Sequence, residues 1–122
     1  MNPELIENAL LDMGVPPCVK GFKAIVLSAC LLDSTNFGIM TIYATVAKAT
    51  GSTPVAIERA VRRTLAMARD CRAGYDAVEK YIGFVNLSNS ASLALLLFQI
   101  HREQHDTVYS QVVENGSIIS WV

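Results

Sequence analysis

Charged side chains gather on one face of a predicted helix in the segment IERAVRR, residues 57–63. Because apolar residues repeat there at helical spacing, the charged side chains between them must point to solvent. These outward residues are Glu58, Arg59, Arg62 and Arg63. Arginine can donate paired hydrogen bonds to guanine O6 and N7 or to phosphate oxygens, and glutamate can accept one from a cytosine amino group. The set predicts a helix that contacts the major groove of double-stranded DNA.

An ordinary solvated helix face would carry the same side chains. Glu58 and Arg62 are four residues apart, and such a pair stabilises an exposed helix by roughly 0.2 to 0.5 kcal/mol. The distribution of charge favours DNA instead, because residues 48–72 hold six basic and two acidic residues while the whole chain has a net charge of −1. This segregation predicts a localised anion-binding face.

The residues before this helix have the side chains that a helix-turn-helix requires. Ala47 allows two helices to cross closely, Gly51 can adopt the positive φ of the turn, and Ile57 fills the space between the helices. Thr53 is expected to cap the second helix, and Pro54 to occupy its first turn.

The start of the second helix is also predicted to bind the DNA backbone. The amides near Ser52 and Thr53 can hold a phosphate at the helix N-terminus. We expect Lys48, Arg63 and Arg69 to supply further cations for phosphates. About four neutralised phosphates would give a slope of log K against log salt of about −3.6.

Catalytic and metal-binding chemistry is not predicted. His101 and His105 have the i, i+4 spacing of a zinc pair, but Arg102 stands where zinc proteases have glutamate. Neither a nucleophile elbow, a phosphate-binding loop nor a dinucleotide glycine pattern occurs. We therefore expect no enzyme activity, no cofactor, no metal and no small-molecule substrate.

The periodicity of apolar residues predicts an all-α fold of about six helices around the helix-turn-helix. The expected helices cover residues 3–13, 22–33, 39–50, 54–72, 76–82 and 90–106. Residues 1–106 would form the DNA-binding domain, and residues 107–122 a C-terminal extension. Because Asn115 and Gly116 suit a tight turn, we predict a short β-hairpin there, with a prolonged last helix as the alternative.

The chain carries no predicted membrane segment or export signal. Its longest apolar runs, residues 24–32 and 93–98, are shorter than the roughly 20 residues that a membrane-spanning helix needs. The N-terminal residues are acidic where a secretory signal would be basic. The three cysteines, Cys18, Cys30 and Cys71, suggest neither a disulfide framework nor a zinc site. We expect a cytoplasmic protein with reduced thiols.

Five short segments of the chain resemble one family in order and spacing: MGVP (13–16), KGF (20–22), YATVAK (43–48), IERAVR (57–62) and YIGF (81–84). They are similar to the DNA-binding effector domain of the stage-zero sporulation response regulator family, over about residues 5–106. The resemblance implies a helical fold around a helix-turn-helix, binding to short promoter boxes, and a homodimer through the last helix. It also places Glu58, Arg59 and Arg62 among the recognition-helix residues.

Two places depart from that family pattern. Val55 and Ala56 stand where the family has polar or basic side chains, and residues 86–92 lack the usual lysine. Two hypotheses follow. The first is a sequence-specific DNA-binding transcriptional regulator. The alternative is a protein-interaction module that dimerises with a related regulator, binds DNA weakly or not at all, and uses the apolar tail that includes Trp121.

Overall fold

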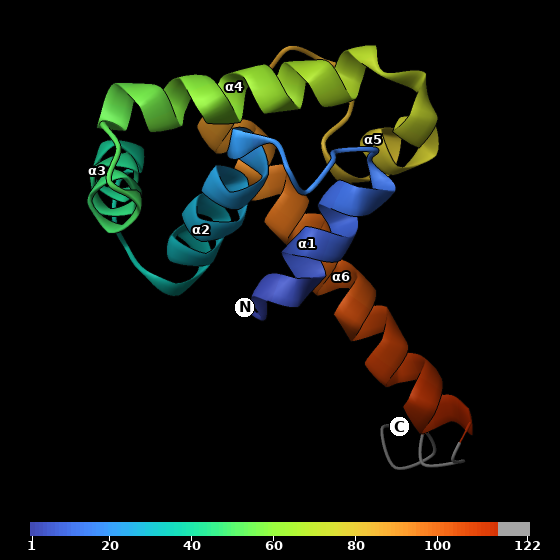
Figure 1. Ribbon diagram of the computed structural model, residues 1–122. Coiled ribbons are helices and arrows are strands. Elements are labelled where there is room, and N and C mark those ends of the chain that lie inside the picture. The colour runs from blue at the N-terminus through green and yellow to red at the C-terminus, as the bar shows by residue number, and fades with distance from the viewer. Residues whose placement is uncertain (115–122) are drawn as a thin grey trace.

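The protein folds into an all-helical bundle, seen in a computed structural model that describes residues 1–114 (Figure 1). The described part contains six α-helices, one 3-10 turn and no strand, which confirms the predicted fold class. The elements are α1 (Pro3–Asp12), α2 (Lys20–Ser34), α3 (Ile39–Thr50), α4 (Pro54–Asp70), η1 (Arg72–Gly74), α5 (Tyr75–Tyr81) and α6 (Asn89–Glu114). No helix in this part of the chain has the length and apolarity needed to cross a bilayer.

Helix α2 lies at the centre of the bundle and packs against α1, α3, α4 and α6. Its sequence is apolar on most sides, as a helix surrounded by others requires. The core that these helices share includes fully buried side chains from every layer, among them Ile6, Leu10, Ile25, Ile42, Val61, Leu93 and Leu96. Burial of this apolar surface holds α4 across one end of the bundle, above the other helices in Figure 1.

A glycine sets the close crossing of α2 and α4. A Cβ atom added to Gly21 would lie 1.7 Å from Oγ1 of Thr64 and 2.5 Å from the backbone oxygen of Ala60, both on α4. No other residue type fits this position without moving the helices apart. The N-terminus of α2 is therefore fixed directly beside α4.

The last helix is longer than expected and corrects the predicted hairpin. Residues 107–114, which would have formed its first strand, continue α6 without a break, so the prolonged helix is the observed form. Extending an existing helix adds a hydrogen bond for each residue without a nucleation cost, whereas an isolated two-stranded hairpin is marginal in water. The predicted turn at Asn115 and Gly116 lies outside the described residues. Helix α6 passes through residue 106, where we predicted the boundary between the DNA-binding domain and the C-terminal extension. That division into two parts stays a prediction.

Candidate nucleic-acid interface

The turn between α3 and α4 has the geometry that the sequence predicts. Gly51 adopts φ 68° and ψ 35°, the left-handed conformation that ends α3. The Ser52 amide donates to the Ala47 carbonyl at 2.8 Å. The side chain of Thr53 then caps α4 by accepting from the Ala56 amide at 3.1 Å. These local bonds fix the direction in which α4 leaves the turn.

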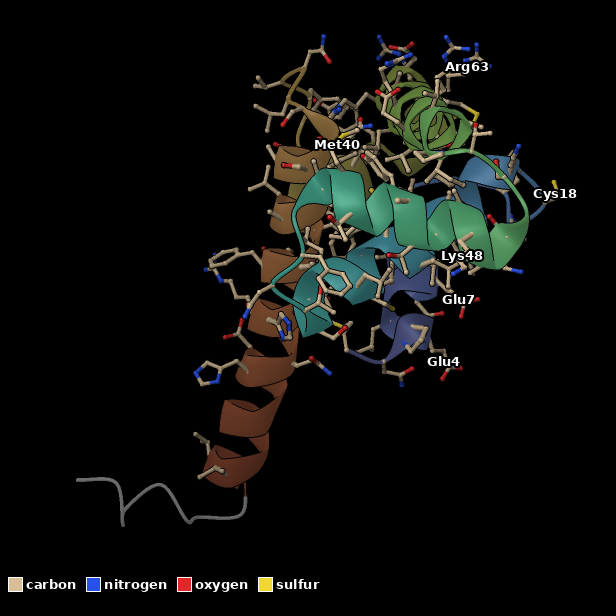
Figure 2. The ribbon with its side chains drawn as sticks, turned by 90° about the vertical axis from the view of Figure 1, so that its left-hand side faces the viewer. Glu4, Glu7, Cys18, Met40, Lys48 and Arg63 are labelled. Carbon is tan, nitrogen blue, oxygen red and sulfur yellow. The ribbon has the colours of Figure 1, made fainter. Side chains whose placement is uncertain are left out.

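Helix α4 is divided sharply between a buried and an exposed face. Its apolar residues are buried beneath it: Ile57, Val61, Leu65 and Ala68. Arg59, Arg62 and Arg63 are exposed, as predicted. In Figure 2 the Arg63 side chain rises from α4 at the end of the molecule, away from the other helices. The guanidinium groups are therefore accessible to a partner that approaches this end.

The three arginines differ in how they are held. Arg62 Nη1 donates to Glu58 Oε1 at 2.6 Å, and this ion pair is solvated because the two side chains are 57% and 35% exposed. Neither Arg59 nor Arg63 forms an ion pair within residues 1–114. Two positive charges on α4 thus lack an internal counter-charge.

The residues predicted to bind phosphate lie at different places. Ser52 is half-buried beside the turn, and Thr53 is exposed with its oxygen already engaged as the helix cap. A hydroxyl that accepts in this way can still donate its hydrogen to a phosphate. Lys48 is exposed, but in Figure 2 it lies well below Arg63 and near the height of Glu7 of α1. The structure therefore sets Lys48 apart from Arg63.

Arg69 has a structural role, which corrects its expected contact with phosphate. Its Nε donates to the Gly83 carbonyl at 2.9 Å, and its Nη2 donates to Oγ of Ser92 at 2.9 Å and to the Ile82 carbonyl at 3.4 Å. Burial lowers the pKa of Arg69 from its ordinary value. Because carbonyls at the end of a helix lack partners within the helix, this guanidinium satisfies the C-terminus of α5 and joins it to α6.

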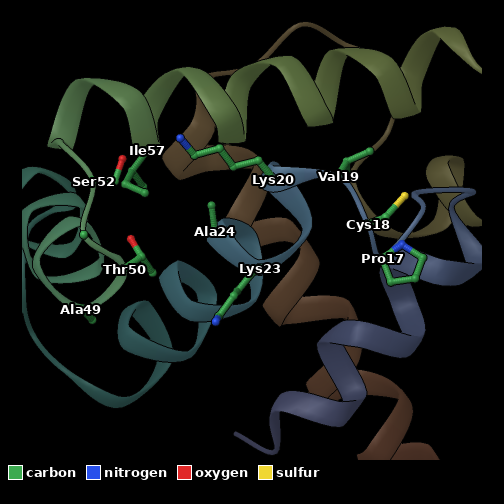
Figure 3. Close-up of a pocket in the computed structure, with 11 residues that line it drawn as sticks. Pro17, Cys18, Val19, Lys20, Lys23, Ala24, Ala49, Thr50, Ser52 and Ile57 are labelled. Atoms are coloured by element: carbon green, nitrogen blue, oxygen red, sulfur yellow. The ribbon is translucent and has the colours of Figure 1, made fainter.

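Two lysines that the motif analysis did not assign to a site lie on one flank of α4. A cavity of about 600 Å³ opens between the start of α2 and the α3–α4 turn, and it is lined by Lys20, Lys23, Thr50 and Ser52 among others (Figure 3). A neighbouring cavity of about 370 Å³ is lined by Lys20 together with Arg59 and Arg63. These lysines precede the arginines by more than 35 residues. The KGF segment includes Lys20, and none of the quoted segments includes Lys23.

The histidine pair on α6 does not form a metal site. His101 Nε2 lies 2.7 Å from Oδ1 of Asp33 and so links α6 to the end of α2. This hydrogen bond is the main reason that the pKa of Asp33 lies below its ordinary value. Among the residues that the structure describes, no three His, Cys, Asp or Glu side chains are grouped to hold a metal ion. Its three cysteines are free thiols.

These features define the class of the protein. A first helix packed by one face on the bundle, a glycine turn and a capped second helix with cations outward form a helix-turn-helix of the type that binds nucleic acid. The chain matches the family described as sporulation initiation factor Spo0A C terminal over residues 6–100, and it belongs to that family.

Members of this family are DNA-binding effector domains of a sporulation regulator, and the family is not one of enzymes. The chain is accordingly a DNA-binding regulatory domain in general terms, with double-stranded DNA as its partner. No significant match was found among curated proteins or among solved structures.

Proposed function

We propose that the protein is a sequence-specific transcriptional regulator that inserts α4 into the major groove. Glu58, Arg59 and Arg62 contact base edges in this arrangement, and Arg63 contacts a phosphate. The observation that carries the proposal is the outward set of guanidinium groups on α4, two of which have no ion-pair partner in residues 1–114. Their charge favours an anionic partner at this face.

The start of α4 completes the proposed contact with the backbone. Ser52 and Thr53 lie at the N-terminus of the helix, where exposed amides and the helix dipole attract a phosphate. Lys48 reaches a phosphate further from the recognition face. Together these contacts set the register of the helix on the duplex.

The pair between Glu58 and Arg62 is compatible with base contact. An exposed pair at this spacing is worth roughly 0.2 to 0.5 kcal/mol, whereas a good bidentate contact from arginine to guanine discriminates by about 1 to 3 kcal/mol. The smaller interaction yields to the larger. Until DNA arrives, the pair holds the Arg62 side chain in place above α4.

We further propose that the protein binds DNA as a homodimer through α6. Leu95 and Phe98 are three residues apart on this helix, so they share one face, and they are 41% and 64% exposed. Exposed apolar side chains that lie together commonly mark a contact with another protein. Two-fold pairing would present two copies of α4 to a palindromic site.

Arg59→Ala tests the role of α4. Because Arg59 is exposed and has no ion-pair partner in the described residues, the substitution should leave the melting temperature unchanged. Fluorescence anisotropy should show a loss of about 1 to 3 kcal/mol in affinity for a duplex that the protein selects from a random pool. Lys80→Ala is the control, because Lys80 pairs with Glu103 on another part of the surface. Equal affinities for the two variants would contradict the proposal.

A protein-interaction module is the second candidate function. Val55, at the start of α4, is 59% exposed at a position that would face DNA. Val85 is 70% exposed in the loop between α5 and α6, residues 82–88, which carries no charge. Exposed apolar side chains at these two places favour contact with another protein. If this reading is right, deleting residues 115–122 will change the oligomer size in size-exclusion chromatography, while Arg59→Ala will leave duplex affinity unaltered.

A further inference from the structure

The N-terminus of α2 carries two lysines that the protein does not neutralise. Lys20 occupies the first position of the helix and Lys23 the next turn, and both are exposed. Neither forms an ion pair within residues 1–114. The first turn of α2 has no acidic residue and no side-chain cap.

This placement of lysines opposes the stability of the helix. The N-terminus of an α-helix has a partial positive charge, so cations there are unfavourable and anions are favourable. Local features that work against folding are found mainly at functional sites, where a ligand compensates for them. An anion bound beside Lys20 and Lys23 would satisfy both the lysines and the helix dipole.

The cavity between α2 and the α3–α4 turn is shaped to receive such an anion. Lys20 and Lys23 come from α2, and Ser52, whose hydroxyl can donate to an anion, comes from the turn. Thr50 also lines the cavity, but its hydroxyl donates to the Val46 carbonyl at 2.8 Å. Figure 3 shows Lys20 directed toward Ser52 beneath α4, and Lys23 further along α2 and directed away from α4. Lysine ammonium groups and hydroxyl groups are common ligands of phosphate.

The cavity lies next to the side of α4 that carries Arg59 and Arg63. Lys20 also lines the smaller cavity with Arg59 and Arg63, so four cations follow one flank of the recognition helix. On the other flank Arg62 and Arg69 line a further cavity with Asp70 and two uncharged asparagines. Arg62 is paired with Glu58, and Arg69 donates to the Gly83 carbonyl. The cations of these cavities that have no ion-pair partner in residues 1–114 therefore lie along one side of α4.

We propose that Lys20 and Lys23, with the cavity at the N-terminus of α2, bind a backbone phosphate of the DNA strand that flanks α4. The proposal rests on the proposed function. A duplex phosphate is the occupant because Lys20 also lines the neighbouring cavity with Arg59 and Arg63, which face the groove in the proposed function. One DNA strand is held by the flank of α4 that carries Arg59 and Arg63. The other strand has fewer ionic contacts, because the loop at residues 82–88 carries no charge.

The test is the double variant Lys20→Gln/Lys23→Gln, compared with Arg72→Gln/Lys80→Gln. The second variant removes the same charge from η1 and α5, away from the cavity and from the proposed dimer face of α6. Anisotropy is measured on a selected duplex and a random duplex across a salt series. We expect the slope of log K against log salt to weaken by about 0.9 for the cavity variant, the contribution of one phosphate.

Two further readings distinguish a phosphate contact from other roles. Affinity for the selected and random duplexes should fall by the same factor, because phosphate contacts carry no sequence information directly. The melting temperature should stay level or rise, because cations leave the N-terminus of α2. An unfolding defect would instead indicate that the lysines have a structural role and would overturn the proposal.

The outcomes separate this proposal from the one on which it rests. If the wild-type protein binds no duplex, the proposed function fails, and this contact fails with it. If the wild type binds and Arg59→Ala weakens binding, but the cavity variant keeps the salt slope of its control, only the phosphate contact is wrong. Binding of inorganic phosphate at the cavity with an unchanged duplex slope would overturn it as well, in favour of a small-anion site.

Discussion

Loss of the Arg69 guanidinium should lower the free energy of unfolding and leave the contacts between the protein and DNA phosphates unchanged. In Arg69→Met the methylene stem stays but the guanidinium is lost. Two hydrogen bonds at 2.9 Å and a longer one at 3.4 Å disappear with it. The hydroxyl of Ser92, a residue with no exposed surface, then loses the donor that Arg69 provides.

The expected cost follows from these bonds. A hydrogen bond to a charged group contributes about 1.5 to 3 kcal/mol, and leaving a buried polar group unsatisfied costs about 1 to 3 kcal/mol. Arg69 is half-buried, so water can reach part of the site and the full sum is not lost. We expect a net loss of about 2 to 3 kcal/mol, which lowers the melting midpoint of a domain of this size by about 10 °C.

Urea unfolding followed by circular dichroism at 222 nm measures this change. Arg72→Met is the matched control, because Arg72 is an exposed arginine in the neighbouring turn and should shift stability by less than about 0.5 kcal/mol. Arg69→Lys should recover only part of the loss, since an ammonium group lacks the planar fork that reaches several acceptors. If Arg69→Met matches the control in stability and instead weakens the salt dependence of DNA binding, our structural assignment is refuted.

Three further changes test the frame around α4. Gly21→Ala should cost about 1 to 3 kcal/mol in unfolding free energy, because its Cβ would overlap Thr64 of α4, and thermal melts will measure it. Thr53→Ala removes the cap of α4 and should cost about 1 kcal/mol, whereas Thr53→Ser should melt like the wild type. Asp33→Asn should lower the free energy of unfolding at pH 7 and lose this effect in acid. The pKa of Asp33 is lower in the folded protein, so the ionised carboxylate stabilises the fold above the unfolded pKa. That stabilisation is lost as the pH falls through the folded pKa. Urea melts of Asp33→Asn and the wild type over a pH series should therefore differ most at pH 7, and the difference should shrink as the pH falls.

The local chemistry of the helix-turn-helix could be predicted from the sequence. Gly51 and Thr53 each act through bonds within a few residues, so their identity and spacing determine the turn. The buried face of α4 follows from helical periodicity for the same reason, and with it the exposure of Arg59 and Arg63. Contacts of this range need no knowledge of the rest of the chain.

The end of α6 was harder to predict because local preferences compete there. Residues 107–114 favour a strand by composition, yet a preceding helix extends through them more readily than a new hairpin forms. The distance of Lys48 from Arg63 likewise depends on the angle of α3 within the bundle, which no spacing in the sequence specifies (Figure 2). The contact of Lys48 with phosphate stays a prediction.

The sequence by itself determined that the chain is helical, where its turn lies, and that its positive charge is concentrated near α4. The tertiary structure alone decided which cations are available to a partner. Arg69 hydrogen-bonds to the carbonyls at the end of α5, and Lys20 comes to lie beside Arg59 and Arg63 from a distant part of the chain. The physical reason is that a side chain's partners are set by which helices pack together, and that packing depends on close contacts such as the one at Gly21.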